Sequence, residues 1–157
     1  MTAQDVAQAV RETLWEDDRA SQAMGMKVLA VGPGSSSVSM MVRQDMLNGH
    51  AICHGGLMTM LADTAFAFAC NAYNEVTVAA GFDVNLISSA RKGDVLTAVC
   101  VEVSKSGRTG VYDVNVHNQR DEPVVAFRGR SYTMKGKPVV DGLPVGRVAT
   151  VLQSSAR

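Results

Sequence analysis

One stretch, Gly55 to Asn71, constrains the fold of this 157-residue chain more than any other. It is rich in Ala, Leu, Met and Phe, and it contains no proline and no β-branched residue except two threonines. This composition favours a helix. The apolar residues cover every side of that helix instead of forming one stripe, as in helices buried at the centre of a protein. The stretch therefore predicts a central helix that the rest of the chain must bury.

Two polar features interrupt this apolar helix. Asp63 lies in its middle, where burial costs roughly 1–3 kcal/mol for an unpaired polar group and more for a charge. Gly55 and Gly56 stand at its start, where unpaired backbone N–H groups and the helix dipole favour negative charge. A buried acid and an oxyanion-binding helix start on one element indicate acyl chemistry.

The residues around these features follow a known pattern. Asn48-Gly-His, Cys53-His-Gly-Gly and Leu61-Ala-Asp-Thr-Ala-Phe-Ala closely resemble the signature of hotdog-fold acyl-CoA thioesterases of the phenylacetate-degradation type. The resemblance extends over about residues 21–134. It implies an α+β hotdog fold, in which a curled antiparallel sheet wraps around a long central helix. It also implies active sites at a dimer interface and aryl-acetyl thioesters as substrates.

The composition fits one compact domain, since 46% of the residues are hydrophobic and 19% are charged. We place this domain, with its N-terminal helix, at residues 1–136, and a C-terminal tail at residues 137–157, where the alternating pattern is lost. No stretch is apolar enough for a membrane span, and no signal-peptide pattern follows Met1. Three unclustered cysteines fit a reducing compartment, so the cytoplasm is expected.

Charge is unevenly spread along a chain of zero net charge. Residues 1–87 carry four Lys or Arg against nine acids, and residues 88–137 carry nine against five. The basic half is suited to attract a phosphorylated ligand. Nucleic acid is not an expected partner, because the basic residues are not clustered in one run and aromatic residues are only 5% of the chain.

The flanking patterns supply a cover for the helix. Residues 2–15 predict an amphipathic helix capped by Thr2 or Asp5, residues 16–23 a helical turn, and residues 26–31 and 37–42 a hairpin. Residues 76–87, 95–105, 109–118 and 124–134 alternate with period two, and tight connections between them predict a four-stranded antiparallel meander. Periodicity alone supports an α+β fold, with the helix against the concave face of the sheet.

The spacing of the two polar features predicts an oligomer. Gly55 and Asp63 are eight residues apart, or about 12 Å along a helix. One thioester carbon cannot contact both within one chain, because attack and oxyanion donors must converge to about 3 Å. A two-fold homodimer with antiparallel central helices brings them together in two shared sites. We also expect a dimer of dimers, a homotetramer.

Each candidate catalytic residue has a role and an alternative. Asp63 acts as nucleophile or as general base, and the residues do not distinguish these. The Gly55 N–H is the candidate oxyanion donor. His54 and Asn48 are polar residues in the loop before the helix. The family resemblance implies that both lie near the reacting group, where either binds the thioester oxygen or the attacking water. Thr64 either orients water or the carboxylate, or bonds back to its own helix.

Two other chemistries are rejected. His50 and His54 have a metal-like spacing, but they lie in a glycine-containing loop with no third ligand, so no metal site is expected. Cys53 is expected to be a small buried residue rather than a nucleophile. No cofactor is predicted, since coenzyme A is part of the substrate.

Basic turns beside glycine are candidates for binding the phosphates of coenzyme A. The residues concerned are Arg91, Lys92 and Gly93 in one turn, and Lys105, Gly107, Arg108 and Thr109 in another. Met58, Met60 and Phe66 either line the acyl pocket or, as we expect, pack in the core.

The function expected is hydrolysis of an aryl-acetyl or medium-chain acyl-CoA to the free acid and coenzyme A. A hydratase or dehydratase of acyl thioesters on the same fold is disfavoured by resemblance, because such enzymes typically place a catalytic His in a proline-rich loop before the helix. Here His54 is followed by Gly-Gly and no proline. A non-catalytic acyl-CoA binding module is the third reading, since fold alone does not settle function.

Overall fold

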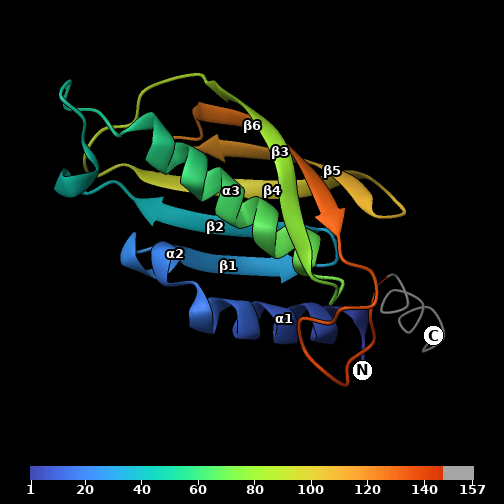
Figure 1. Ribbon diagram of the computed structural model, residues 1–157. Helices are drawn as coiled ribbons and strands as arrows, with labels where there is room; N and C mark the ends of the chain where they lie inside the picture. Colours follow the sequence, from blue (N-terminus) through green and yellow to red (C-terminus); the bar gives the residue numbers. More distant parts are fainter. Residues whose placement is uncertain (147–157) are drawn as a thin grey trace.

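The structure is a computed structural model that describes residues 1–146 (Figure 1). A six-stranded antiparallel sheet curls around the long helix α3, which confirms the α+β architecture. The elements in chain order are α1 (Ala3–Asp17), α2 (Arg19–Ala23), β1 (Lys27–Gly32), β2 (Ser35–Met41), the 3-10 turn η1 (Gln44–Met46), α3 (Gly55–Asn71), β3 (Thr77–Leu86), β4 (Val95–Ser106), β5 (Thr109–His117) and β6 (Pro123–Thr133). No helix of residues 1–146 is long and apolar enough to cross a membrane.

The strand order corrects one prediction. The order is β1-β2-β4-β5-β6-β3, so only β4, β5 and β6 form a meander, and β3 pairs with β6 instead of β4. Residues 87–94 are therefore not a tight turn but a connection across the start of α3. Along this connection Ile87 N–H bonds to Val124 O, Cys53 N–H to Ala90 O, and Gly93 N–H to Val42 O. It delivers β4 to β2, where a seven-residue ladder forms.

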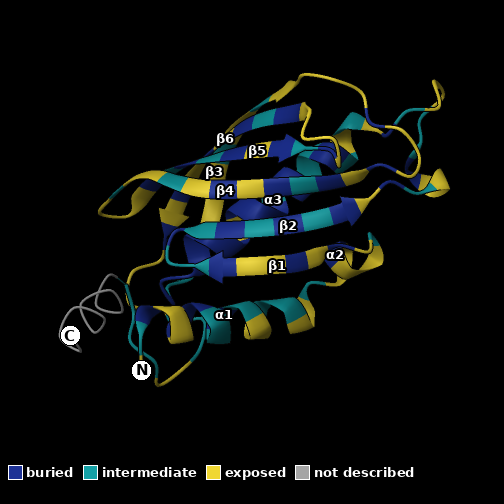
Figure 2. Cartoon of the chain, turned by 180° about the vertical axis from the view of Figure 1, so that it is seen from behind, coloured by how far each residue is buried: buried dark blue, intermediate teal, exposed yellow. Residues whose placement is uncertain are grey.

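The two edges of the sheet differ. Along the β1 edge lies α1, which begins with a capping box between Thr2 and Asp5 (Figure 2). Side chains of α1 bond to backbone carbonyls of β1, from Gln4 to Val31 O and from Arg11 to Val28 O. The opposite edge is β3, which has no strand partner beyond β6 among the described residues.

The concave face of the sheet holds α3 closely. The Phe66 ring packs against the rings of Tyr112 and Phe127, with centroids 5.5 and 5.9 Å away. The strand opposite carries Gly129, where an added Cβ would lie 2.8 Å from the Phe66 ring. In contrast to the expected burial on every side, one stripe of α3 is not fully covered in the single chain, and we call it the uncovered stripe. Its members Gly56 and Ala67 are exposed, and Met60 and Asp63 are half-buried.

The first part of the predicted C-terminal tail is tied to the fold. The side chain of Asn74 bonds to backbone atoms of Val140, Leu143 and Pro144, and Gly146 N–H bonds to Tyr73 O. Residues 137–146 therefore lie against the α3–β3 connection. The rest of that tail, residues 147–157, is outside the described residues.

Gly129→Ala should destabilise the fold by about 1–3 kcal/mol, because the new methyl group overlaps a ring that its aromatic neighbours hold in place. Urea denaturation measures the loss. Gly49→Ala is the matched control, since an added Cβ there has no neighbour within 4 Å. Equal stability of the two variants would show that α3 is not fixed at this height above the sheet.

Candidate active site

The loop before α3 positions an amide donor. The Asn48 side-chain oxygen accepts the backbone N–H of His50 at 2.9 Å and that of Ile52 at 3.5 Å. The loop closes with a bridge between Leu47 and Cys53. Because the oxygen is occupied, the Nδ2 group of Asn48 is left as a donor, and it has no acceptor within residues 1–146.

The start of α3 leaves one backbone donor free. His54 is the N-cap, and its Nδ1 accepts the N–H of Gly56 at 3.1 Å. In the neutral imidazole the proton then lies on Nε2, which becomes a second side-chain donor. The N–H of Gly55 has no acceptor in the described part of the chain. Of the two glycines singled out from the sequence, only Gly55 therefore offers its N–H to a ligand.

A cavity of about 270 Å³ lies at this end of α3. We call it the helix-start cavity; it is lined by Asn48, Ile52, Cys53, Gly55, Met58, Leu86, Ile87, Ser88 and Ser89. A Cβ on Gly55 would lie 2.6 Å from Leu86 Cδ1, so the end of this exposed leucine side chain would have to move to admit it. Sequence reasoning missed residues 86–89, because nothing in their pattern shows that the end of β3 reaches α3.

Asp63 lies more than two turns further along α3, on its uncovered stripe. Burial raises the pKa of its carboxyl above the usual value of about 4. No hydrogen bond or ion pair to Asp63 is formed by the residues described. A carboxylate that is desolvated and unpaired is a stronger base than an exposed one, and such groups are frequent at catalytic sites.

Other candidates lie in plainer surroundings. Thr64 Oγ1 donates to Met60 O at 2.9 Å, which is the bond back to its own helix considered as an alternative for this residue. It also lies 3.2 Å from Ser21 Oγ. Cys53 is buried as expected, and burial raises the pKa of its thiol. His50 is exposed at the tip of the loop. Within residues 1–146, no three His, Cys, Asp or Glu side chains gather in a way that could hold a metal ion.

The two basic turns lie at opposite ends of the sheet. Arg91, Lys92 and Gly93 are exposed and continue from Ser89 in the wall of the helix-start cavity. The other turn, with Lys105, Gly107, Arg108 and Thr109, joins β4 to β5. Because β4 has 12 residues, the turns are about 36 Å apart. One chain thus brings Asn48, His54 and Gly55 to the first turn, but neither Asp63 nor the second turn.

The predicted acyl-pocket residues divide between core and cavity. Phe66 is a core residue, as expected. Met58 is buried and also lines the helix-start cavity, and Met60 lies on the uncovered stripe.

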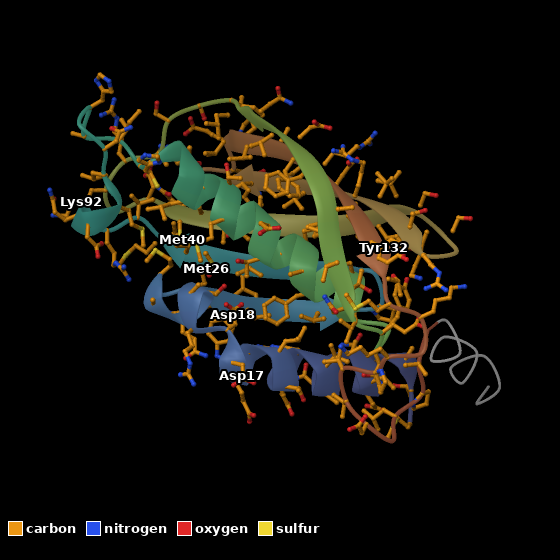
Figure 3. The ribbon with its side chains drawn as sticks, viewed as in Figure 1. Asp17, Asp18, Met26, Met40, Lys92 and Tyr132 are labelled. Carbon is orange, nitrogen blue, oxygen red and sulfur yellow. The ribbon has the colours of Figure 1, made fainter. Side chains whose placement is uncertain are left out.

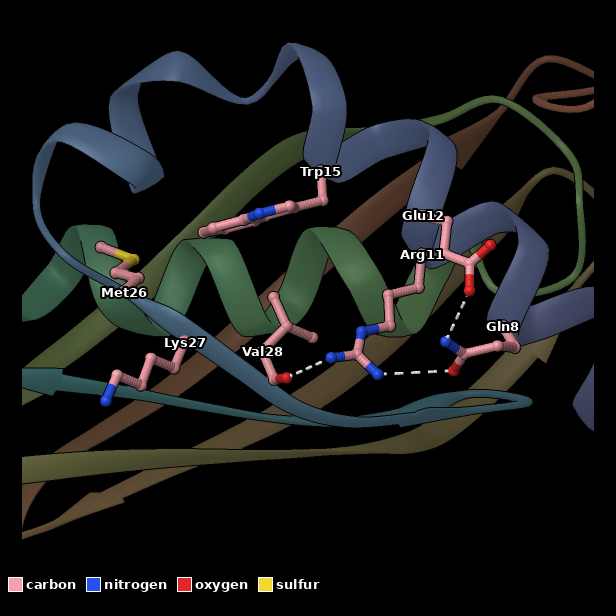
Figure 4. A pocket seen from close by; sticks show the side chains of 7 residues that line it. All are labelled: Gln8, Arg11, Glu12, Trp15, Met26, Lys27 and Val28. Atoms are coloured by element: carbon pink, nitrogen blue, oxygen red, sulfur yellow. Dashed lines mark hydrogen bonds between the residues drawn. The ribbon is translucent and has the colours of Figure 1, made fainter.

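Another cavity contains none of the predicted site residues. It has about 440 Å³, lies between α1 and β1, and is lined by Gln8, Arg11, Glu12, Trp15, Met26, Lys27 and Val28 (Figure 4). Its guanidinium group, on Arg11, is already bonded to Val28 O and Gln8 Oε1. This cavity belongs to the contact that covers β1.

Comparisons with known proteins agree with this fold. Residues 50–125 match the Thioesterase superfamily. Acyl-coenzyme A thioesterase PaaI of Escherichia coli is 38% identical over 78% of this chain and 88% of its own length. The structure of E. coli PaaI, from the phenylacetic acid degradation operon, covers 86% of this chain and 98% of its own, with a TM-score of 0.84 and 36% identity.

A second solved structure, the TT0310 protein of Thermus thermophilus, is also 36% identical, with a TM-score of 0.71 over 73% of this chain and 97% of its own. The structure of a hypothetical thioesterase protein from Streptococcus pneumoniae with coenzyme A, at 22% identity, shares the fold. The curled sheet around a central helix and these matches indicate the same family. The chain belongs to the hotdog-fold thioesterase superfamily, among the thioester hydrolases that resemble PaaI.

Proposed function

We propose that this protein hydrolyses acyl-CoA thioesters to a free acid and coenzyme A at sites shared by two chains. In each site the Gly55 N–H binds the developing oxyanion, and Asp63 of the partner subunit provides the nucleophile or general base. One observation carries the proposal, namely that α3 holds a free backbone donor at its start and an unpaired, desolvated carboxylate in its middle. The PaaI relative is named an acyl-coenzyme A thioesterase, which supports the substrate class.

The open edge of the sheet supports the dimer. Gly55 and Asp63 are about 12 Å apart along α3, so one chain cannot complete the site. The β1 edge is covered by α1, whereas β3 is open and exposes Val78, Phe82 and Leu86. A second copy that pairs along β3 with antiparallel orientation brings the start of one α3 to the middle of the other. We keep the dimer of dimers as a further expectation.

The donors at the helix start define the order of events. The thioester carbonyl oxygen accepts hydrogen bonds from Gly55 N–H and Asn48 Nδ2, with His54 Nε2–H placed beside them. The carboxylate of Asp63 then attacks the carbonyl carbon, or it takes a proton from a water that attacks. The C–S bond breaks as the oxyanion collapses, and coenzyme A leaves as the thiolate, which takes up a proton. If water is the attacking group, the free acid forms in this step. If Asp63 is the nucleophile, a mixed anhydride forms on its carboxylate, and water then hydrolyses it to the free acid and the carboxylate. Thr64 is proposed to position the water or the carboxylate, and its bonds to Met60 O and Ser21 hold its own side chain in place.

Coenzyme A is proposed to lie along the end of the dimer. There the turn of Arg91, Lys92 and Gly93 continues from the helix-start cavity. Antiparallel chains bring the partner's Lys105, Gly107, Arg108 and Thr109 to that same end, although they are remote within one chain. Basic side chains beside glycine amides suit phosphate groups. The proposed reaction uses no metal or redox cofactor, and three free cysteines are compatible with a cytoplasmic enzyme.

Asp63→Asn should lower thiol release from acyl-CoA by more than about tenfold, or about 1.4 kcal/mol of barrier, because the amide is neither nucleophile nor base. Thiol release is followed with a chromogenic thiol reagent on a panel of acyl-CoAs. A variant that retains activity within tenfold of the parent would show that Asp63 is not catalytic. A parent that binds acyl-CoA without turnover would instead indicate a binding module.

The same substitution should raise the melting temperature at pH 7. Since the folded state raises the pKa of Asp63, it binds that proton more tightly than the unfolded chain does. Ionised Asp63 therefore lowers stability above its folded pKa, and this cost disappears as the pH falls toward about 4. Thermal unfolding of parent and variant across this range should show a gain at pH 7 that shrinks on acidification. A constant difference would contradict the raised pKa.

Arg91→Glu should raise KM several-fold for acyl-CoA but little for a thioester of N-acetylcysteamine, which lacks the nucleotide. The reason is the loss of a cation from the proposed phosphate contact, and the difference should shrink at high salt, which screens exposed charges over about 8–10 Å. Lys27→Glu, an exposed cation on β1, is the control. Equal losses on both thioesters would indicate a damaged site instead.

A further inference from the structure

A second cavity lies along α3, beyond Asp63. It has about 290 Å³, and we call it the α1–α3 cavity; it is lined by Leu14, Asp17, Asp18, Ala67, Phe68 and Asn71. The first three residues come from the end of α1 and the cap of α2, and the other three from the last turns of α3. The cavity therefore lies between the α1–α2 junction and the C-terminal half of the central helix.

Helix geometry places this cavity next to the reacting carbon. Ala67 follows Asp63 by four residues, so it lies on the same face of α3, about 6 Å further along the axis. Both residues are on the uncovered stripe. A thioester carbon held at Asp63 thus has the α1–α3 cavity on one side. On the other side it has the helix-start cavity of the partner, because the two α3 helices run in opposite directions.

The lining of the α1–α3 cavity is suited to an apolar group. Leu14 and the buried ring of Phe68 form its walls, and the Trp15 ring lies 6.4 Å from the Phe68 ring. The polar atoms of Asn71 are engaged, since Nδ2 bonds to Ala67 O and Thr77 O and Oδ1 accepts Thr77 N–H. The side-chain amide of Asn71 is therefore not free to bind a polar ligand in this cavity.

Its rim carries two carboxylates. Asp17 is exposed, and Asp18 uses one oxygen to accept Ser21 N–H at the start of α2. Figure 3 labels both at the junction of α1 and α2. By contrast, the helix-start cavity contains Asn48, Ser88 and Ser89 and leads to Arg91, so it suits the polar pantetheine arm and its phosphates.

We propose that the α1–α3 cavity binds the acyl group of the substrate, and that Asp17 and Asp18 disfavour acyl groups that end in a carboxylate. This inference rests on the proposed function. It assigns uncharged acyl groups longer than acetyl as the preferred class. Leu14, Asp17 and Asp18 lie outside residues 50–125, the part that matches the Thioesterase superfamily. Selectivity is thus carried in part by the N-terminal helices.

Filling the cavity tests the location. Ala67→Leu should lower the ratio of kcat/KM for octanoyl-CoA to that for acetyl-CoA by at least about fivefold, because the larger side chain excludes the longer acyl group. Ala20→Leu, on the exposed side of α2, is the matched control and should leave the ratio unchanged. A smaller fall in the Ala67→Leu enzyme would overturn the assignment.

Neutralising the rim tests the charge selection. Asp17→Asn combined with Asp18→Asn keeps side-chain shape and an oxygen for the cap, and should raise kcat/KM for glutaryl-CoA relative to pentanoyl-CoA by about fivefold or more. Glu12→Gln combined with Glu16→Gln removes the same charge from α1 outside the cavity and should leave that ratio within twofold. Equal ratios in the two double variants would overturn the role of the rim.

These outcomes differ from a failure of the proposed function. If the parent enzyme releases no thiol from any acyl-CoA, the hydrolytic function itself is wrong. If the parent is active and both ratios are insensitive to the substitutions, thioester hydrolysis stands and the acyl group binds elsewhere.

Discussion

The packing of α3 against the curled sheet governs the rest of this structure. The concave face covers most of the helix, and the rings of Tyr112 and Phe127 fix the position of Phe66 above the strands. One stripe stays outside this contact and carries Asp63, which neighbouring atoms desolvate and no described residue pairs. A carboxylate in these surroundings is disfavoured as a charge. Use of this carboxylate as a base in the proposed reaction would explain why the fold keeps it on a rigid helix despite its cost in stability.

The two edges of the sheet differ in whether another chain can pair with them. Side chains of α1 bond to carbonyl groups of β1, and they close the edge at which another chain would otherwise pair. Within residues 1–146 the β3 edge stays open, and Leu86 at its end lies next to Gly55 at the start of α3. A second copy that pairs along β3 would therefore contact the strand whose end lines the proposed oxyanion site. In the proposed dimer, assembly and the geometry of the site would depend on the same strand.

Much of the fold was predictable from local patterns, but the order of the strands was not. Gly55–Asn71 was found because a proline-free apolar run after Gly-Gly has strong local signals. The strands were placed within one or two residues because period-two alternation is also local. The pairing of β3 with β6 depends on residues 87–94 crossing the start of α3, which leaves no mark in the alternation.

The site was predictable to a similar degree. Asp63 and Gly55 follow from the cost of a buried charge and from the free donors of a helix start. The proposed donor role of Asn48 Nδ2 can be inferred only when the loop bonds to Oδ1 are known. Leu86 and the α1–α3 cavity come from segments that are distant in sequence, so no local pattern indicates them. Whether Thr64 acts beyond its local bonds stays a prediction.

Complementation between two inactive chains tests the shared site most directly. Gly55→Pro removes the proposed oxyanion donor at a position where proline suits the first turn of a helix, although the new ring also meets the Leu86 side chain. Asp63→Asn removes the carboxylate. A heterodimer of the two variants has one site with both defects and one intact site, so about half the parental activity should return. Heterodimers that are verified by mass but remain inactive would contradict a site built from two chains.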